Sequence, residues 1–520
     1  MHSTTTHEPP SDVLPTAPRT GRRRWLFRLA AIILGLSPLV AAEALCTAFD
    51  WGRPAVHDDP FVGFRSVRPL FVLNGDETRY EIPKSRHTYF RPESFAAAKA
   101  PREFRIFCLG ESTVQGNPWT IETSFTTWLE LALAAADPSR TWEVVNCGGI
   151  SYASYRLAPI LAEVLAYQPD LIIICVGHNE FLEARTFDHV AGRGAIANAA
   201  LDVAAQSRTF TLVREGYLRL QGRSSADPPD GRPILTTEVE ALLDYRGGLE
   251  QYHHDEAGRQ GVIAQYRFNV RRMVEAAQAA GVDVLLVNPV SNFSDSPPFK
   301  SEHGPGLTPA ERAKWEAVCN EAREHLHGER RNLRGAAQLF EEACRLDPLH
   351  AGGWYNLAKC REEAGEFEMA RNAYLQAKDV DVCPLRILQP MSDALLQIAR
   401  DTGTPLLDAQ GLFDEHSPHG ITGGQWLVDH VHPSIEGHQL LADTLLEQLA
   451  SLGKVAARAD WKALAHERYR EHYASLGNLY FIKGTKRLEA LRGWAAGRAE
   501  RVRMTGTSAA KSPQQSAIGP

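Results

Sequence analysis

The chain of 520 residues lacks a strong charge of either sign. Its 56 Lys and Arg residues are set against 63 Asp and Glu residues, which leaves a net charge of −7, and 44% of its residues are hydrophobic. These values are typical of an ordinary globular protein, and they give no electrostatic reason to expect a nucleic acid partner. The length leaves room for more than one domain.

Paired-cysteine motifs are also missing, although the chain holds eight cysteines. None of them forms a Cys-x-x-Cys pair or has the spacing of metal ligands, so we expect no metal site and no cofactor. Cys108, Cys147 and Cys175 lie on or beside predicted core strands, where a free thiol behaves as a small apolar group. We therefore expect mostly free, buried thiols.

Apolar residues are scarce at the C-terminal end. Residues 505–520 are expected to be a disordered tail for this reason. The segments of 453–504 before it are expected to be helical, with basic side chains at Lys483, Lys486, Arg487, Arg492, Arg498, Arg501 and Arg503. A solvated helix face explains this charge better than contact with anionic lipid does, given the membrane topology expected below.

One long apolar run is present, near the N-terminus. Arg22, Arg23 and Arg24 precede an apolar stretch at 25–45, which is long enough to span a bilayer. The arginines should keep 1–24 cytoplasmic, so that everything after Cys46 lies on the far side of a single-pass membrane anchor. A cleaved signal peptide is the alternative, because 41–44 is rich in small residues.

Two buried strands each lead into a polar side chain. The mostly apolar run at 104–109 predicts a strand that ends at Gly110, and Ser112 follows in the strand-to-helix turn. A second apolar strand at 171–176 ends at Gly177 and is followed by Asn179. Since ligands of open α/β folds bind at the carboxyl edge of the sheet, a hydroxyl and an amide donor should meet there.

A third segment adds a base and its carboxylate. Asp429 and His432 are three residues apart, so the carboxylate can hold the imidazole of the same local segment in one tautomer. Pro433 fixes the backbone after the histidine, before an apolar helix at 440–449. A serine hydroxyl is a weak nucleophile until such an imidazole takes its proton, so the three segments together predict a serine hydrolase.

The chain thus resembles the SGNH hydrolases, also called GDSL esterases and lipases. Ser112 matches the nucleophile, in Gly-Glu-Ser where the family has Gly-Asp-Ser, and Asn179 matches the oxyanion asparagine. Asp429 and His432 match the Asp-x-x-His block. The resemblance implies an α/β fold, a flavodoxin-like three-layer sandwich with a parallel sheet, and the triad Ser112, Asp429 and His432.

The same resemblance implies an oxyanion hole made by Ser112, Gly149 and Asn179. The register of the second block at 146–152 is ambiguous, and Ser151 could replace Gly149 as the amide donor. His178 and His430 match no required family position, and we interpret both as satisfied surface or loop histidines.

The predicted domains follow from these blocks. A lead-in at 50–101 has no clear period, and the hydrolase core occupies 102–301 and 382–452. The first part is interrupted at about 185–259, where a turn-prone loop at 222–231 could form a lid or a substrate wall. A helix at 268–280 and a strand at 282–287 extend the strand and helix alternation.

A helical module at 308–381 separates the two parts of the core. Its spacing matches a tetratricopeptide repeat at Trp354, Leu357, Ala358, Gly365, Phe367, Ala370, Tyr374 and Ala377. A first helix at 308–326 and a second around 336–344 resemble an earlier, degenerate repeat. So short an array cannot bury a solenoid core alone, so it should pack on the hydrolase and could bind a protein partner; a plain helical hairpin without a partner is the alternative.

Two functions compete at this point. The first is a membrane-anchored ester hydrolase that cleaves an acyl or O-acetyl ester of a small molecule or a cell-envelope glycan, or the related acyltransferase. The second is a catalytically silent scaffold protein that binds a partner through the repeat module. The presence of Ser112, Asn179, Asp429 and His432 together favours the first.

Overall fold

The computed structural model describes residues 20–49, 51, 69–182, 207–210, 212–213, 248–327 and 331–498. It divides into two units, one made of residues 1–60 and 192–232 and the other of 61–191 and 233–520. Most of the predicted insertion at 185–259 and the tail at 505–520 lie outside the described residues.

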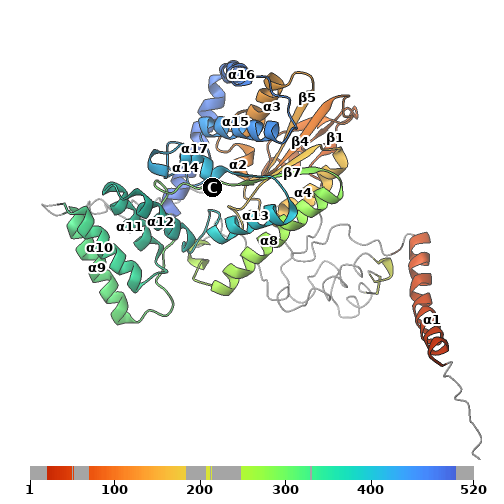
Figure 1. Ribbon diagram of the computed structural model, residues 1–520, viewed down its shortest axis with the longest axis horizontal. Helices are drawn as coiled ribbons and strands as arrows, with labels where there is room; N and C mark the ends of the chain where they lie inside the picture. Colours follow the sequence, from red (N-terminus) through yellow and green to blue (C-terminus); the bar gives the residue numbers. More distant parts are fainter. Residues whose placement is uncertain are drawn as a thin grey trace, which may run out of the picture. The chain divides into compact units, whose positions relative to one another are not determined.

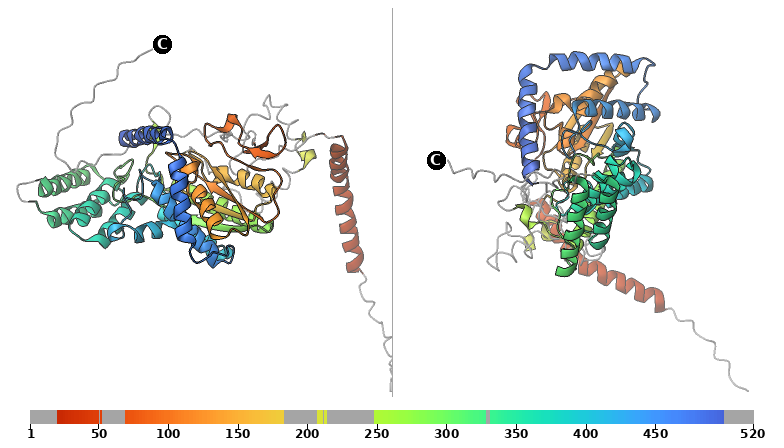
Figure 2. Two further views of the ribbon diagram at one scale, coloured as in Figure 1. Left: turned by 90° about the horizontal axis from the view of Figure 1, so that it is seen from above. Right: turned by 90° about the vertical axis from the view of Figure 1, so that its left-hand side faces the viewer.

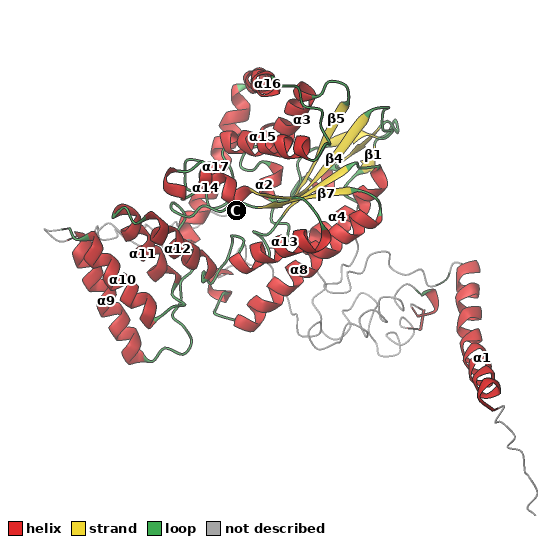
Figure 3. Ribbon diagram, in the orientation of Figure 1, coloured by secondary structure: helices red, strands yellow, loops and turns green. Residues whose placement is uncertain are grey.

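The larger unit is built on a five-stranded parallel sheet with the strand order β5-β4-β6-β7-β8 (Figures 1 and 3). Its strands are β4 (Glu103–Gly110), β5 (Thr141–Gly148), β6 (Leu171–Cys175), β7 (Asp283–Asn288) and β8 (Leu406–Asp408). In the register, Gly110 at the end of β4 lies beside Gly148 and Cys175. The loops that follow β4, β5 and β6 therefore start at one edge of the sheet.

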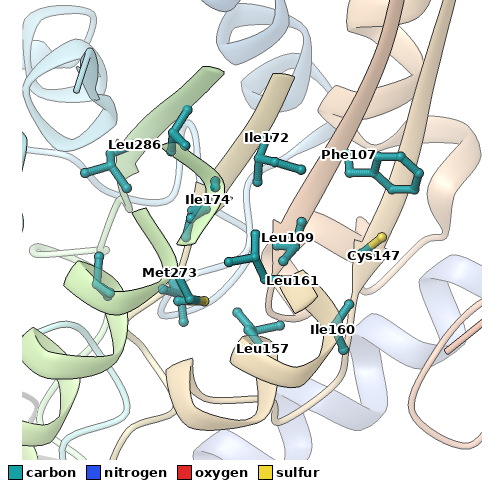
Figure 4. Close-up of a cluster of buried hydrophobic side chains, with 14 of the residues drawn as sticks. Phe107, Leu109, Cys147, Leu157, Ile160, Leu161, Ile172, Ile174, Met273 and Leu286 are labelled. Carbon is teal, nitrogen blue, oxygen red and sulfur yellow. The ribbon is translucent and has the colours of Figure 1, made fainter. Parts of the chain in front are cut away.

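Helices cover both faces of this sheet. One face packs on α4 (Ser154–Val164), α8 (Glu256–Ala279) and α13 (Gln389–Thr402), and the other on α3 (Phe125–Ala136) and α15 (Ile435–Ser451). Helix α16 (Trp461–Ser475) packs on α3 and adds Ala465 and Tyr469 to the second core. Successive strand residues alternate between the two cores. Phe107 and Leu109 join the first core (Figure 4), and Ile106 and Cys108 join the second. The α/β fold with a parallel sheet is thus confirmed.

The lead-in forms a small antiparallel sheet of β1 (Val72–Leu73), β2 (Arg79–Glu81) and β3 (Ser94–Ala96). Its strands are too short to show a period in the sequence, which is why the pattern predicted no element here. Phe71, Phe90 and Phe95 from this segment are buried in the same core as Phe107. The segment therefore extends the apolar core on one face of the parallel sheet.

Four helices form the inserted module: α9 (Pro309–His327), α10 (Leu333–Leu346), α11 (Ala351–Glu363) and α12 (Phe367–Asp379). They pack side by side (Figure 2) around a core that contains Leu357 and Tyr374, with Trp354 and Phe367 only partly buried against it. The helices lie where the repeat spacing predicts them. Their apolar core also includes residues from outside the module, Phe293 and Ile421.

The remaining elements are short or terminal. The short elements are α2 (Ser112–Gln115), α14 (Ala409–Glu415) and the 3-10 turns η1 (Lys84–Arg86), η2 (Ile121–Thr123), η3 (Leu165–Tyr167), η6 (Gly248–Gln251) and η7 (Pro418–Gly420). The C-terminal helix α17 spans Asn478–Arg498. All eight cysteines are free and buried, as expected.

The predicted anchor falls within α1 (Thr20–Ala48), a helix of the smaller unit that contains Pro38. Among the helices of the described residues, none has both the length and the hydropathy needed to cross a bilayer.

Candidate active site

Ser112 lies in the turn between β4 and α2. Two residues before it, at Gly110, the close packing of the strands requires a glycine. A Cβ on Gly110 would lie 2.2 Å from the backbone oxygen of Cys175, so only glycine allows the strands to stay this close. The turn then starts α2 at Ser112, whose side chain is 8% exposed. The hydroxyl is therefore almost enclosed at the carboxyl edge of the sheet.

Asp429 and His432 lie against this serine. The His432 Nε2 atom is 2.8 Å from Ser112 Oγ, and its Nδ1 atom is 2.7 Å from Asp429 Oδ2. Because a carboxylate only accepts hydrogen bonds, Nδ1 carries the proton and Nε2 is free to accept the proton of the serine hydroxyl. The structure thus brings the three residues predicted as a triad into one hydrogen-bonded chain.

The Asp429 carboxylate is held in its ionised form. It also accepts hydrogen bonds from the backbone N–H groups of Val431, at 2.9 Å, and His432, at 2.8 Å. Burial alone would raise the pKa of Asp429, but the neighbouring His432 and His430 together with these bonds bring its pKa below the ordinary value. A permanent negative charge beside Nδ1 favours the imidazolium that forms when His432 takes a proton.

Asn179 follows β6, after Gly177 with φ of 150°. Its Nδ2 atom donates to the backbone oxygen of Tyr152 at 3.2 Å, which leaves the second amide hydrogen available. The backbone N–H of Ser112 donates to no acceptor among the described residues. Two of the three predicted oxyanion donors, Ser112 and Asn179, therefore each keep an N–H without an acceptor among the described residues.

The third predicted donor, the amide of Gly149, is already used. Its N–H donates to Gly110 O at 3.0 Å, while the N–H of Ile150 donates to Tyr89 O and that of Tyr152 to Gly149 O. Ser151, with φ of 60°, is the residue of this stretch whose N–H has no acceptor in the described part of the chain. Of the two residues that the sequence left open, Ser151 thus has the available N–H among the described residues, and its role as an oxyanion donor stays a prediction.

Glu111 has a role that the sequence did not predict. Its carboxylate is fully buried and accepts hydrogen bonds from three consecutive backbone N–H groups, those of Gly177 at 3.1 Å, His178 at 3.0 Å and Asn179 at 3.0 Å. Burial raises the pKa of Glu111 to about 8, against the effect of these bonds. The residue before Ser112 therefore fixes the loop that carries Asn179, and an acidic residue inside an otherwise buried motif was the one signal for it in the sequence.

His178 and His430 lie in loops, one of the two places that the sequence suggested, but they are buried and not at the surface. His178 is 2% exposed, and its Nδ1 atom accepts from the backbone N–H of Ile387 at 3.1 Å. The His430 ring packs edge-on against Phe299, 4.9 Å between centroids. Burial lowers the pKa of His430 to about 4 and that of His178 well below its ordinary value, so both rings are neutral at pH 7.

The loop of the dyad is fixed by residues that flank the helical module. Asn292 donates through Nδ2 to Asp429 O and through its backbone N–H to His430 O, both at 2.9 Å. The buried Arg386 donates in turn to the backbone oxygens of Asn292 and Ser296, each at 2.9 Å. No sequence motif pointed to these contacts, because they join segments far apart in the chain.

A family model described as the GDSL-like Lipase/Acylhydrolase family matches residues 108–339. The match includes Ser112, Ser151 and Asn179 and ends before Asp429 and His432. No curated protein matches the chain.

Several solved structures of lipolytic proteins and esterases are similar to this chain, with low sequence identities and low TM-scores. A putative lipolytic protein of the G-D-S-L family from Desulfitobacterium hafniense DCB-2 is 13% identical over 66% of this chain and 98% of its own, with a TM-score of 0.27. The acetylxylan esterase Axe2 from Geobacillus stearothermophilus is 14% identical over 70% and 99%, with a TM-score of 0.30. A lipase/acylhydrolase from Enterococcus faecalis is 11% identical over 68% and 98%, also at 0.30.

Proposed function

We propose that this chain, which carries the GDSL-like lipase/acylhydrolase domain of an ester-hydrolysing enzyme, cleaves an acyl or O-acetyl ester with Ser112, His432 and Asp429. The observation that carries the proposal is the chain of hydrogen bonds from Ser112 Oγ to His432 and on to Asp429, at 2.8 and 2.7 Å. These distances lie within the range at which a base can take a proton from a nucleophile.

The geometry supports the following first step. Ser112 Oγ attacks the ester carbonyl carbon while its proton passes to His432 Nε2, and the carbonyl oxygen becomes an oxyanion. The N–H groups of Ser112 and Ser151 and the Asn179 amide are the donors proposed for that oxyanion. When the tetrahedral intermediate collapses, the proton on Nε2 goes to the leaving alcohol and an acyl-serine remains.

The second step resolves the acyl-serine. Water gives a proton to His432 Nε2 as its oxygen attacks, and the collapse returns the proton to Ser112 Oγ and releases the acid. An acyltransferase would use an acceptor alcohol in place of water at the same site. The hydrogen bonds that join Ser112, His432 and Asp429 weigh against the alternative of a catalytically silent scaffold protein. That the helical module binds a protein partner stays a prediction.

Membrane anchoring also stays a prediction of the sequence. Extraction of host membranes with alkaline carbonate tests it, since an anchored protein would remain in the pellet and a peripheral one would be released. Release of the full-length chain would contradict the predicted anchor without affecting the proposed chemistry.

Labelling by a fluorophosphonate tests the nucleophile. In the full-length protein, peptide mapping should place the label on Ser112, and Ser112→Ala should remove it together with turnover of a simple aryl ester. Ser139→Ala is the matched control, because Ser139 is exposed and bonded only near Asp137. A folded Ser112→Ala protein that still hydrolyses the ester and takes up the label would disprove the proposal.

A further inference from the structure

Helix α17 lies against the loop that follows α2, the short helix that begins at Ser112 (Figure 1). The Arg487 guanidinium donates to the backbone oxygens of Pro118 and Trp119, at 2.6 and 3.3 Å. Asn117, the residue before Pro118, donates through its N–H to Ser112 O at 3.0 Å. Arg487 is therefore connected to the backbone of the proposed nucleophile through two loop residues.

The same helix also reaches the loop of Asp429 and His432. Arg492 donates through Nε to the backbone oxygen of Val428 at 3.0 Å. The N–H of Val428 donates in turn to His432 O at 2.8 Å, and Asp429 is the next residue of the chain. Arg492 is therefore connected to the backbone of the proposed base through one residue.

The basic residues of α17 thus differ in their surroundings. Lys483 and Lys486 are exposed, as a solvated helix face requires. Arg487 is half-buried, and Arg492, although exposed, is bonded to the backbone oxygen of Val428. The solvated face that the sequence suggested therefore explains the two lysines but not the two arginines.

A glycine allows α17 to lie this close to the loop. A Cβ on Gly484 would be 2.1 Å from Trp119 Cδ1 and 2.4 Å from its Nε1, so any larger residue would displace the helix or the ring. One turn before it, Tyr480 Oη lies 2.7 Å from Thr123 Oγ1 and accepts the N–H of Thr120 at 3.3 Å. Contacts at positions 480, 484 and 487 therefore fix this part of α17 to the segment after the nucleophile.

An α-helix rises about 1.5 Å per residue, so positions 487 and 492 lie about 7.5 Å apart along the axis of α17. We propose that α17 sets the separation between Ser112 and His432, with Arg492 as a positioning residue for the loop of the base. Ser112 and His432 are 320 positions apart in the chain, yet proton transfer needs their reacting atoms within about 2.6–3.2 Å. The effect on turnover rests on the proposed ester hydrolysis, whereas the effect on the loop does not.

Two glycines of α17 provide a matched pair of variants of the full-length protein. Gly484→Ala and Gly493→Ala change the helix propensity alike, but a Cβ on Gly493 would have open space around it, with no described atom within 4 Å. We expect Gly484→Ala to lower kcat for a simple aryl ester about 10- to 100-fold with little change in KM, since a misplacement of about 1 Å can cost about 100-fold in rate. Gly493→Ala should keep both values of the wild type.

Arg492→Met tests the single bond to Val428. Loss of one hydrogen bond should lower kcat about 2- to 10-fold. Arg492→Lys, which keeps a donor, should recover part of this loss, and Lys486→Met, at an exposed residue of the same helix, should cause none. Turnover of Arg492→Met at the rate of the wild type would overturn the positioning role of Arg492.

A purely structural role of α17 predicts a different result. It would lower the melting temperature of Gly484→Ala but leave kcat unchanged well below the melting transition, and that outcome would overturn the proposal. A positioning role predicts that two losses are not additive. In a His432→Ala background, Gly484→Ala should lower the residual turnover less than about twofold, because no base is left to misplace. Equal losses in both backgrounds would contradict the proposal as well.

Hydrogen exchange of the Val428 N–H, which is bonded to His432 O, measures the loop without turnover. We expect faster exchange in Gly484→Ala than in Gly493→Ala. An unchanged exchange rate together with an unchanged kcat would overturn the proposal while leaving the esterase intact. Wild-type protein that hydrolyses no ester, with this difference in exchange between the variants, would support the role of α17 and count against the proposed function instead.

Discussion

The two halves of the candidate site are held in place by different means. Ser112, Ser151 and Asn179 follow β4, β5 and β6 directly, and those strands are buried on both faces by apolar side chains. Asp429 and His432 follow no strand, and their loop is fixed by hydrogen bonds from Asn292 and by the bridge between Leu427 and Pro433.

Because the two halves are held differently, they should differ in how strongly a single substitution disturbs their geometry. The strand-held half depends mainly on an apolar core of many contacts, and in it the loop of Asn179 is also held by one buried polar group, Glu111. The loop-held half depends on a few buried polar groups, and each of those is costly when its partner is lost. The segments that flank the inserted module therefore matter more to His432, the proposed base, than to Ser112, the proposed nucleophile.

The largest effect should come from Arg386→Met, which breaks the loop-held half. Arg386 is 3% exposed, bonds to Asn292 and Ser296, and faces the buried Asp381 at 3.7 Å. Removal of one partner of a buried ion pair typically costs about 3–5 kcal/mol. Urea unfolding should show this loss, and activity should fall with it.

Addition of Asp381→Asn to Arg386→Met is the control for this variant. The double variant removes the uncompensated carboxylate, so it should recover part of the lost stability. If Arg386→Met unfolds like the wild type and keeps its activity, the dyad loop does not depend on these polar contacts, and the contrast between the halves is wrong.

A smaller effect is expected for Asn179→Ala, which tests the strand-held half. Removal of one oxyanion donor typically lowers kcat about 100- to 1000-fold. The fold should persist, because the loop is held by Glu111 through backbone N–H groups that the substitution leaves unchanged.

Glu111→Leu is the comparison for Asn179→Ala. Leucine offers no acceptor to the three buried N–H groups of Gly177, His178 and Asn179, so this variant should lower both activity and melting temperature. If turnover in Asn179→Ala falls less than about tenfold, the Asn179 amide does not contribute to turnover as a donor of an oxyanion hole is expected to.

The sequence predicted the strand-held half well because its signals are local. An apolar run, a glycine and a polar residue stand next to one another at 104–112 and again at 171–179. The spacing of Asp429 and His432 was equally local, and the structure brings both to Ser112.

The parts that the sequence missed depend on contacts between distant segments. Glu111 reaches residues 66–68 positions away, and Arg386 reaches Asn292 across 94 positions. Burial of His178 and His430 depends on Ile387 and Phe299, which no local pattern connects with them. Choice of Ser151 over Gly149 required knowing that Gly110 already accepts the Gly149 amide.

The smallest expected effect concerns the pH dependence of stability and comes from His438, which lies between the loop of Asp429 and His432 and the apolar core. This ring lies six residues after His432 in α15, is 1% exposed, and accepts the backbone N–H of Phe125 at Nδ1. Burial, and next the neighbouring His432, lower the pKa of His438 to about 3. The unfolded chain therefore takes up a proton on this residue near pH 6.5 while the folded chain does not, so its contribution to stability is intact above that pH and is lost as the pH falls toward 3.

We expect His438→Gln to remove this dependence, since glutamine can accept the Phe125 N–H and does not titrate. As the pH falls from 6 to 4, the free energy of unfolding of the variant should rise relative to that of the wild type by about 1.4 kcal/mol for each pH unit. Urea unfolding at several pH values measures it, and His416→Gln, at an exposed ring, should run parallel to the wild type. Parallel behaviour of His438→Gln as well would mean that His438 is protonated in the folded protein, and that the core beneath the dyad is less closed to water than its packing indicates.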